Sequence, residues 1–430
     1  MKTNLIKSNR VSCSKRVALF AVVTLVLIYF GIGFYFSQVI PHKGFETFSE
    51  CLRLGDFGDG RSSDGETMWI GNAHAIKGEN PLPFLMNEKE PEHGIKKAIE
   101  NNNPYLPWTY ITSNVFFPGF ISLLPALWWC MIVSLMLIVL MAVKIRQTVF
   151  TESKNIFLST LVMLLCLAQY GFCPSLKFIN ASLFVTPLII LGVLYNGKKN
   201  EIITGLLLGL AMLKPQTAAL FFIPLLFQKK WKSIITGVLC VLVPWFCAAL
   251  VYEINFVQLF LDHQAANLKI SELYNQLNPN TLYWGFLDYF IQTEIISSNI
   301  GTMVQVIIFT AVTAILSYKY RNASNAVLFS IPAVFSTCWM YCVSTNLPVL
   351  ALLIMAIVLL LFREKRLPLI TKILLMAGIV FLIMPIPELI RKIYSPIFLP
   401  LLQRSIYIVL LAIVLKYEKI KNVTIENKIK

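Results

Sequence analysis

Charged residues are scarce in this chain, and their scarcity limits the class of protein that it can be. Only 14% of its 430 residues are charged, whereas 57% are hydrophobic. So small a share of charge cannot cover the surface of a soluble globule of this size. The composition therefore predicts an integral membrane protein that crosses the bilayer several times.

Several chemical signatures are missing as well. The nine Cys lie mostly inside apolar runs, and their spacing predicts neither a zinc site nor a disulfide framework. The chain has no nucleotide-binding glycine loop and no D-x-D motif, so we expect no nucleotide sugar, no obligatory metal and no cofactor. The net charge of +15 comes from Lys and Arg clusters at the ends of apolar runs, where such clusters set membrane topology. We therefore expect no nucleic acid partner.

Apolar runs bounded by basic clusters predict the topology of the chain. A first run at 17–40 follows a basic N-terminal stretch and is expected to be an uncleaved span with its N-terminus in the cytoplasm. We expect further spans at about 119–143, 155–172, 178–195, 233–252, 301–318, 324–342, 346–362, 368–386 and 400–416. The predicted fold is a single all-α polytopic membrane domain over 1–430, with about ten full spans and both termini cytoplasmic.

The apolar segment 202–227 breaks this pattern, because basic clusters flank both of its ends. Both ends are then cytoplasmic, yet two helices of roughly 12 residues each reach only about 18 Å. We predict a short helical hairpin whose apex is Lys214-Pro215-Gln216. A Lys within the membrane indicates a functional site, although a Lys that extends to the membrane surface is the alternative.

Two long polar segments, 41–118 and 253–299, are predicted to be extracytoplasmic loops. The first contains apolar pieces around Trp69 and Trp108, which we expect to form interfacial helices. It also carries the carboxylates Asp59, Asp64 and Glu66 in a Gly- and Ser-rich stretch. A carboxylate where water meets lipid can take a proton from a hydroxyl. The alternative is that these acids are ordinary solvated loop residues.

Three stretches together resemble glycosyltransferase family 87, a group of GT-C class transferases that use polyprenyl-phosphate sugars. Asp64 followed by Trp69, Gly78 and Pro81 is similar to the family's D...Y...G-x-P-Y pattern. The G-L-L-L-G run at 205–209 leading to Lys214-Pro215 is similar to its G-L-L-L-G-L-A...K-P segment. The stretch 336–341 resembles its S-P-x-S-W-x-H-H stretch in part, with Tyr341-Cys342 in place of a His pair.

The resemblance implies a GT-C-like membrane transferase, and in it the first outer loop is catalytic and Asp64 is the catalytic Asp. It also implies a polyprenyl-phosphate donor that carries a hexose, usually mannose. We expect transfer to a lipid-linked or glycan acceptor on the extracytoplasmic face, with inversion of configuration. The missing His pair leaves the sugar and the linkage open.

These expectations assign candidate roles to nine residues. Asp64 is the catalytic base. Lys214, Gln216 and Arg404 bind the donor phosphate, with an anchor at the membrane interface as the alternative for Arg404. The residues Asp59, Glu66, His263, Trp339 and Tyr341 contact the acceptor or the sugar. The partners are then a polyprenyl-phosphate sugar, a glycan or glycolipid acceptor and membrane lipid, in a multi-pass protein of the bacterial plasma membrane. A transporter or flippase, with Lys214 as a substrate counter-charge, and a polysaccharide polymerase are the alternatives.

Overall fold

The computed structural model describes residues 64–82, 106–149, 180–197, 199–277, 298–339, 346–363, 367–383 and 398–429. All regular secondary structure in this part of the chain is helical, and it contains no strand, which confirms the predicted all-α class. The first predicted span and the span at 155–172 lie outside the described residues. The helices are α3 (Asp64–Ile76), α6 (Pro107–Thr112), η1 (Ser113–Val115), α7 (Leu123–Val149), α10 (Ser182–Tyr195), α11 (Glu201–Ala211), α12 (Pro215–Ala218), η2 (Ala219–Phe221), α13 (Phe222–Phe227), α14 (Trp231–Val251), α15 (Phe256–Leu277), α17 (Ser298–Lys319), α18 (Asn325–Trp339), α19 (Asn346–Arg363), α20 (Leu369–Ile383) and α22 (Phe398–Ile429).

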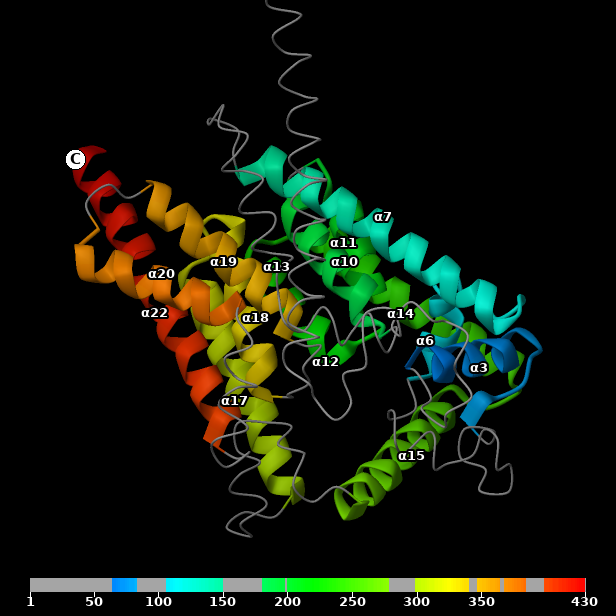
Figure 1. Cartoon of the computed structure of the whole chain (residues 1–430). Helices are drawn as coiled ribbons and strands as arrows, with labels where there is room; N and C mark the ends of the chain where they lie inside the picture. The colour runs from blue at the N-terminus through cyan, green and yellow to red at the C-terminus, as the bar shows by residue number, and fades with distance from the viewer. Residues whose placement is uncertain are drawn as a thin grey trace, which may run out of the picture.

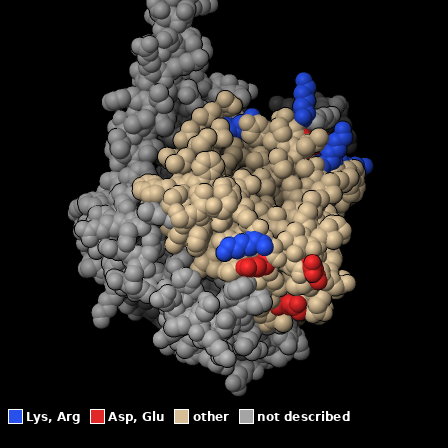
Figure 2. Space-filling model, turned by 90° about the vertical axis from the view of Figure 1, so that its right-hand side faces the viewer, with Lys and Arg blue, Asp and Glu red and all other residues tan. Residues whose placement is uncertain are grey.

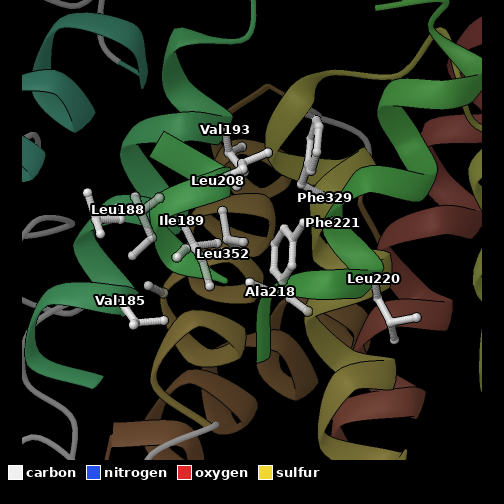
Figure 3. Packing of buried hydrophobic residues seen from close by; sticks show 14 of the residues in the cluster. Val185, Leu188, Ile189, Val193, Leu208, Ala218, Leu220, Phe221, Phe329 and Leu352 are labelled. Carbon is white, nitrogen blue, oxygen red and sulfur yellow. The ribbon is translucent and has the colours of Figure 1, made fainter. Parts of the chain in front are cut away.

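Two central helices, α10 and α19, form the core of the described structure. A helix that is apolar on every face is stable only where it is surrounded, and both sequences have this character. All residues from Ser182 to Val193 are buried, as are those from 351 to 358 of α19. Val185 and Ile189 of α10 pack near Leu208, Leu352 and Phe221 in one apolar cluster (Figure 3).

Helices α11 and α14 approach each other closely because glycines line their contact. A Cβ added to Gly205 would lie 2.3 Å from the backbone oxygen of Ser233, and one added to Gly209 would lie 2.6 Å from Cβ of Cys240. Small residues four apart allow helix backbones to come this near in a membrane. The G-L-L-L-G run therefore has a packing role in this structure.

The outward faces of α7 and α14 are apolar. Both helices are long and apolar enough to cross a membrane, over Pro125–Ile145 and Trp231–Val251, and these are the two that meet this test among the described residues. Figure 2 shows basic residues at the upper edge of this face, a broad uncharged area below them, and charged residues of both signs towards the lower edge. The arrangement is typical of a surface that contacts lipid.

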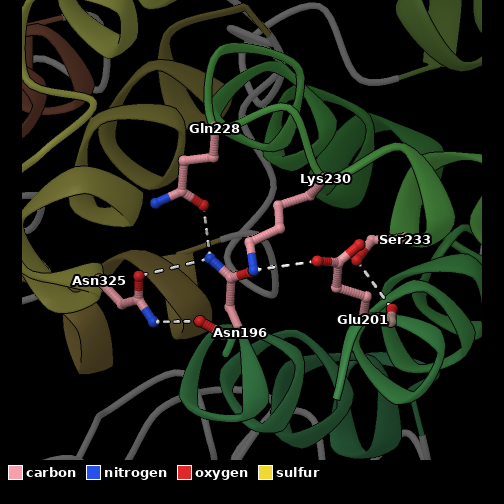
Figure 4. A network of polar contacts seen from close by, with 6 residues as sticks. All are labelled: Asn196, Glu201, Gln228, Lys230, Ser233 and Asn325. Carbon is pink, nitrogen blue, oxygen red and sulfur yellow. Dashed lines mark hydrogen bonds and ion pairs between the residues drawn. The ribbon is translucent and has the colours of Figure 1, made fainter. Parts of the chain in front are cut away.

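The two ends of the segment 201–230 lie together. Lys230 Nζ donates to Glu201 Oε1 at 3.3 Å, and Ser233 Oγ donates to the Glu201 carbonyl at 2.7 Å. Beside them, Asn196 Nδ2 donates to Gln228 Oε1 at 2.7 Å, and Asn325 Nδ2 donates to the Asn196 carbonyl at 3.0 Å (Figure 4). This polar network fixes the chain on both sides of the segment at one end of the bundle.

The helices of the two predicted outer loops gather at the other end of the bundle. Figure 1 shows α3, α6 and α15 close to one another, on the side opposite the C-terminus. Helix α6 contacts both α3 and α15, and it also packs along α14. The described parts of 41–118 and 253–299 therefore form one assembly of α3, α6, η1 and α15, which we call the outer assembly after its predicted side.

Candidate active site

Lys214 lies in a break between α11 and α12. Pro215 has no backbone N–H, and its ring disfavours a helical conformation in the residue before it. Helix α11 accordingly ends at Ala211, and Lys214 has φ −121° and ψ 82° before α12 begins at Pro215. Lys214 is buried, with a relative exposure of 5%. An ammonium group is thus held inside the protein at an interrupted helix.

The Lys214 ammonium group contacts the N-terminal end of α10. Its Nζ donates to Asn180 Oδ1 and, at 3.1 Å, to Ser182 Oγ. Asn180 Oδ1 also accepts the backbone N–H of Ser182 at 2.9 Å, so the first turn of the helix positions these oxygens. A helix N-terminus carries partial positive charge. The ammonium and the helix end therefore bring positive potential to the same place.

Helix α6 lies against this break. The indole N–H of Trp108 donates to the carbonyl oxygen of Met212 at 3.0 Å. The Trp108 ring lies 5.8 Å from that of Trp245 between centroids, and Trp245 stacks on Phe256 at 3.9 Å. Helix α6 thus supplies a hydrogen-bond donor to the Met212 carbonyl, which lies in the break outside a regular helix.

Helix α3, which begins at Asp64, is fixed to the same group of helices. Asn72 donates to the Phe117 carbonyl at 2.6 Å and accepts the hydroxyl of Ser113 at 2.7 Å. The Tyr110 ring fills the space beside Gly71, where an added Cβ would lie only 2.2 Å from the ring. The outer helix that carries Asp64 and Glu66 is therefore packed onto α6 and η1.

His263 of α15 is buried in this outer assembly. Its ring lies 6.1 Å from that of Tyr110, at an interplanar angle of 47°, and its side chain is fully buried. This contact joins α15 to α6, and the Tyr110 ring of α6 also lies beside Gly71 of α3. The structure therefore places His263 within the outer assembly rather than on an exposed loop.

Arg404 lies on α22 and is 1% exposed. It is close enough to Cys338 on α18 to interact with it electrostatically, and α18 packs against both α22 and α12. Trp339 is the last residue of α18, and Gln216 is the second residue of α12. Helix α18 therefore contacts both α12, which follows Lys214, and α22, which carries Arg404.

Two of the predicted site residues, Asp59 and Tyr341, lie outside the described residues. Conversely, the structure adds Asn180 and Ser182, which the sequence did not single out, and Trp108, which the sequence predicted only as part of an interfacial helix. A polar Asn-Ala-Ser immediately before a long apolar run is a helix-start signal. The sequence therefore contained a local signal for Asn180 and Ser182. Across the ranges that the structure describes, no group of His, Cys, Asp and Glu is arranged to hold a metal ion.

Together, the apolar helices and the buried Lys214 beneath α3, α6 and α15 are features of a membrane protein. The chain belongs to glycosyltransferase family 87, whose family model matches residues 110–345, more than half of its length. This match confirms the resemblance seen in the sequence, and it shows that the protein is a glycosyltransferase enzyme that acts on a sugar donor and an acceptor. The matched range includes Lys214, His263 and Tyr341 but begins after Asp64 and ends before Arg404.

The family model is the comparison that identifies the chain. No curated protein matches the sequence, and no solved structure matches it either.

Proposed function

We propose that the protein transfers a hexose, with mannose favoured, from a polyprenyl phosphate to a lipid-linked or glycan acceptor outside the cytoplasm. The observation that carries this proposal is the Lys214 ammonium, held against the start of α10 beneath the outer helices. Two sources of positive potential at one buried place suit the phosphate of a donor whose lipid tail stays in the bilayer. The choice of mannose rests on the family resemblance.

The reaction is a direct displacement at the anomeric carbon. Asp64 takes the proton of the acceptor hydroxyl, and the hydroxyl oxygen forms a bond to the anomeric carbon from the face opposite the phosphate. The bond between that carbon and the phosphate oxygen breaks, and the lipid phosphate leaves with the electron pair. Because the attack comes from the opposite face, the configuration is inverted.

Charge develops on the leaving phosphate as this bond breaks, and fixed cations lower the barrier by stabilising it. Lys214 has this role, with Gln216 and Arg404 as further phosphate ligands. Interactions of this kind are stronger in a site with little water. The deep burial of Lys214 and Arg404 supports this assignment.

Five residues are assigned to the acceptor or the sugar in this proposal: Asp59, Glu66, His263, Trp339 and Tyr341. His263 has the best structural support, because it lies in the outer assembly beside Tyr110. The family resemblance supports Trp339 and Tyr341. The carboxylates Asp59 and Glu66 come from the stretch around Asp64, where they could accept hydrogen bonds from sugar hydroxyls.

The proposed topology places the outer assembly on the extracytoplasmic side of a bacterial plasma membrane. It has about ten full spans, both termini in the cytoplasm, and the segment 202–227 as a hairpin that enters from the cytoplasmic side. The contact between Glu201 and Lys230, which joins the two ends of that segment, supports this arrangement. So does the uncharged area between two levels of charge (Figure 2).

A transfer assay tests the proposal. The purified protein in liposomes receives polyprenyl-phosphate mannose, or the glucose analogue as a comparison, with a glycan acceptor. We expect a product whose new glycosidic bond has the opposite anomeric configuration to the donor. If neither sugar is transferred while a labelled sugar lipid crosses the bilayer, the protein is a flippase and the proposal is wrong.

A further inference from the structure

Trp108 occupies an unusual position between the outer helices and the broken helix. In an unbroken helix, the backbone N–H of residue 216 would donate to the carbonyl of Met212. Here α11 ends at Ala211, and the indole N–H of Trp108 donates to that oxygen at 3.0 Å. The side chain is almost fully buried, at 6% exposure, so water does not easily replace it.

The Met212 carbonyl belongs to the turn that leads into Lys214. The backbone N–H groups of Met212, Leu213 and Lys214 bond to carbonyls at 209, 210 and 211, at 3.1 to 3.2 Å. After the break, Thr217 and Ala218 both donate to the Lys214 carbonyl. The Trp108 bond is therefore made two residues before the residue whose ammonium reaches α10.

We infer that Trp108 is a positioning residue, which fixes the turn at 211–215 through Met212 and so couples the outer helix α6 to Lys214. A break in a helix leaves backbone polar groups without their helical partners. Away from water, each such group needs another partner within the protein. The assignment of Lys214 to the donor phosphate rests on the proposed function. The tether itself rests on the geometry of Trp108 and Met212.

The chain offers a matched control in Trp245. Its ring packs beside that of Trp108 and stacks on Phe256. It is therefore also an indole in contact with α6 and α15. Within the described part of the chain, however, its buried Nε1 has no hydrogen-bond partner. Removal of the indole N–H from each residue in turn thus separates the hydrogen bond from the ring packing.

Hydrogen exchange on the ligand-free protein tests the inference. Benzothienylalanine, which keeps the bicyclic shape of Trp without its N–H, is incorporated at position 108 or at position 245, and Trp108→Phe and Trp245→Phe provide a second pair. Loss of a donor to a buried carbonyl changes such equilibria about 5- to 100-fold. We expect amide exchange across 211–218 to accelerate by a factor in this range for the position 108 variants and to stay unchanged for the position 245 variants.

Equal exchange at 211–218 in the two matched variants overturns the inference, because Trp108 would then act by packing alone. The transfer assay supplies a second readout, in which the position 108 variants raise the donor KM about 10-fold with a smaller change in kcat. If the unmodified protein transfers no hexose, the proposed function fails. The exchange difference still decides whether the tether exists, since it requires no substrate.

Discussion

At the scale of single residues, the candidate site contains a cation, Lys214, whose position is set by two structural features. Pro215 determines that the helix breaks beside Lys214, while Asn180 and Ser182 determine where the ammonium points. A Lys placed against a helix N-terminus is unfavourable by itself. In the proposed function, the donor phosphate would relieve this repulsion.

We expect Lys214→Met to raise the donor KM by about 10- to 100-fold, the value of a lost charge-assisted hydrogen bond. Asn180 Oδ1 keeps the N–H of Ser182 as a donor, so the fold should survive. Lys230→Met is the matched control, because Lys230 pairs with Glu201 at the other end of the bundle. Binding of polyprenyl-phosphate mannose checks both variants, and unchanged binding by Lys214→Met contradicts the phosphate role.

Asp64 is assigned to proton transfer, and its replacement tests that step apart from binding. Asp64→Asn keeps the shape of the side chain but removes the base, so kcat should fall by about 10²- to 10⁴-fold with little change in donor KM. Asp262→Asn on α15 serves as a control, since its carboxylate accepts a bond from Gln258 at 2.6 Å in the same outer region. A fully active Asp64→Asn would show that another group is the base.

At the scale of elements, packing of small residues holds the broken helix in place. Helix α11 lies on α14 along Gly205 and Gly209, and Gly237 of α14 in turn receives the ring of Phe222 from α13, where an added Cβ would lie 2.3 Å from the ring. Glycines at these positions bring both halves of the segment 201–227 against one partner. The break is thus supported on both sides by α14.

Gly205→Ala should destabilise the protein by about 1 to 3 kcal/mol, because its methyl group would meet the backbone of Ser233 and force the helices apart. The control is Gly197→Ala, where an added Cβ would lie 3.9 Å from the Tyr195 carbonyl and meet no other atom of the described residues within 4 Å. Thermal unfolding in detergent compares the two variants. A Gly205→Ala protein as stable as the control would mean that α11 and α14 are not packed this closely.

At the scale of the whole molecule, the polar network at one end and the outer assembly at the other define two faces. The Asn196, Gln228 and Asn325 contacts (Figure 4) join α10, α13 and α18 at the first face. The Tyr110 and His263 contact joins the outer segments at the second. Lys199, Lys229 and Lys230 neighbour this network in the chain, and Lys144 lies over the ring of Tyr195. Because basic residues favour the cytoplasmic side, we expect this face to be cytoplasmic.

We therefore expect Lys77→Cys on the segment after α3 and Val257→Cys on α15 to react with an impermeant thiol reagent in intact cells. Both positions are exposed. Lys199→Cys, before α11, should react only after the membrane is opened. Labelling is measured above that of the unmodified protein, and reaction at only one of the two outer positions would show that they face different sides.

The sequence was sufficient for the properties that depend on composition and local chemistry. Its low charge predicted the apolar helices, and a proline after Lys214 predicted an interruption where α11 gives way to α12. The G-L-L-L-G and Lys-Pro pattern indicated the family that the family match then confirmed. These signals are local, because helix propensity, proline geometry and hydropathy act over a few residues.

Only the tertiary structure decided which groups meet at the break. Lys214 bonds to Asn180, 34 residues earlier, and Met212 accepts from Trp108, 104 residues earlier. The sequence also pointed to the glycines at 205 and 209 as a family signature without showing that they pack against α14. Contacts of this kind depend on which helices pack together, and hydropathy does not specify the neighbours of an apolar helix, because apolar side chains pack almost equally well against many partners.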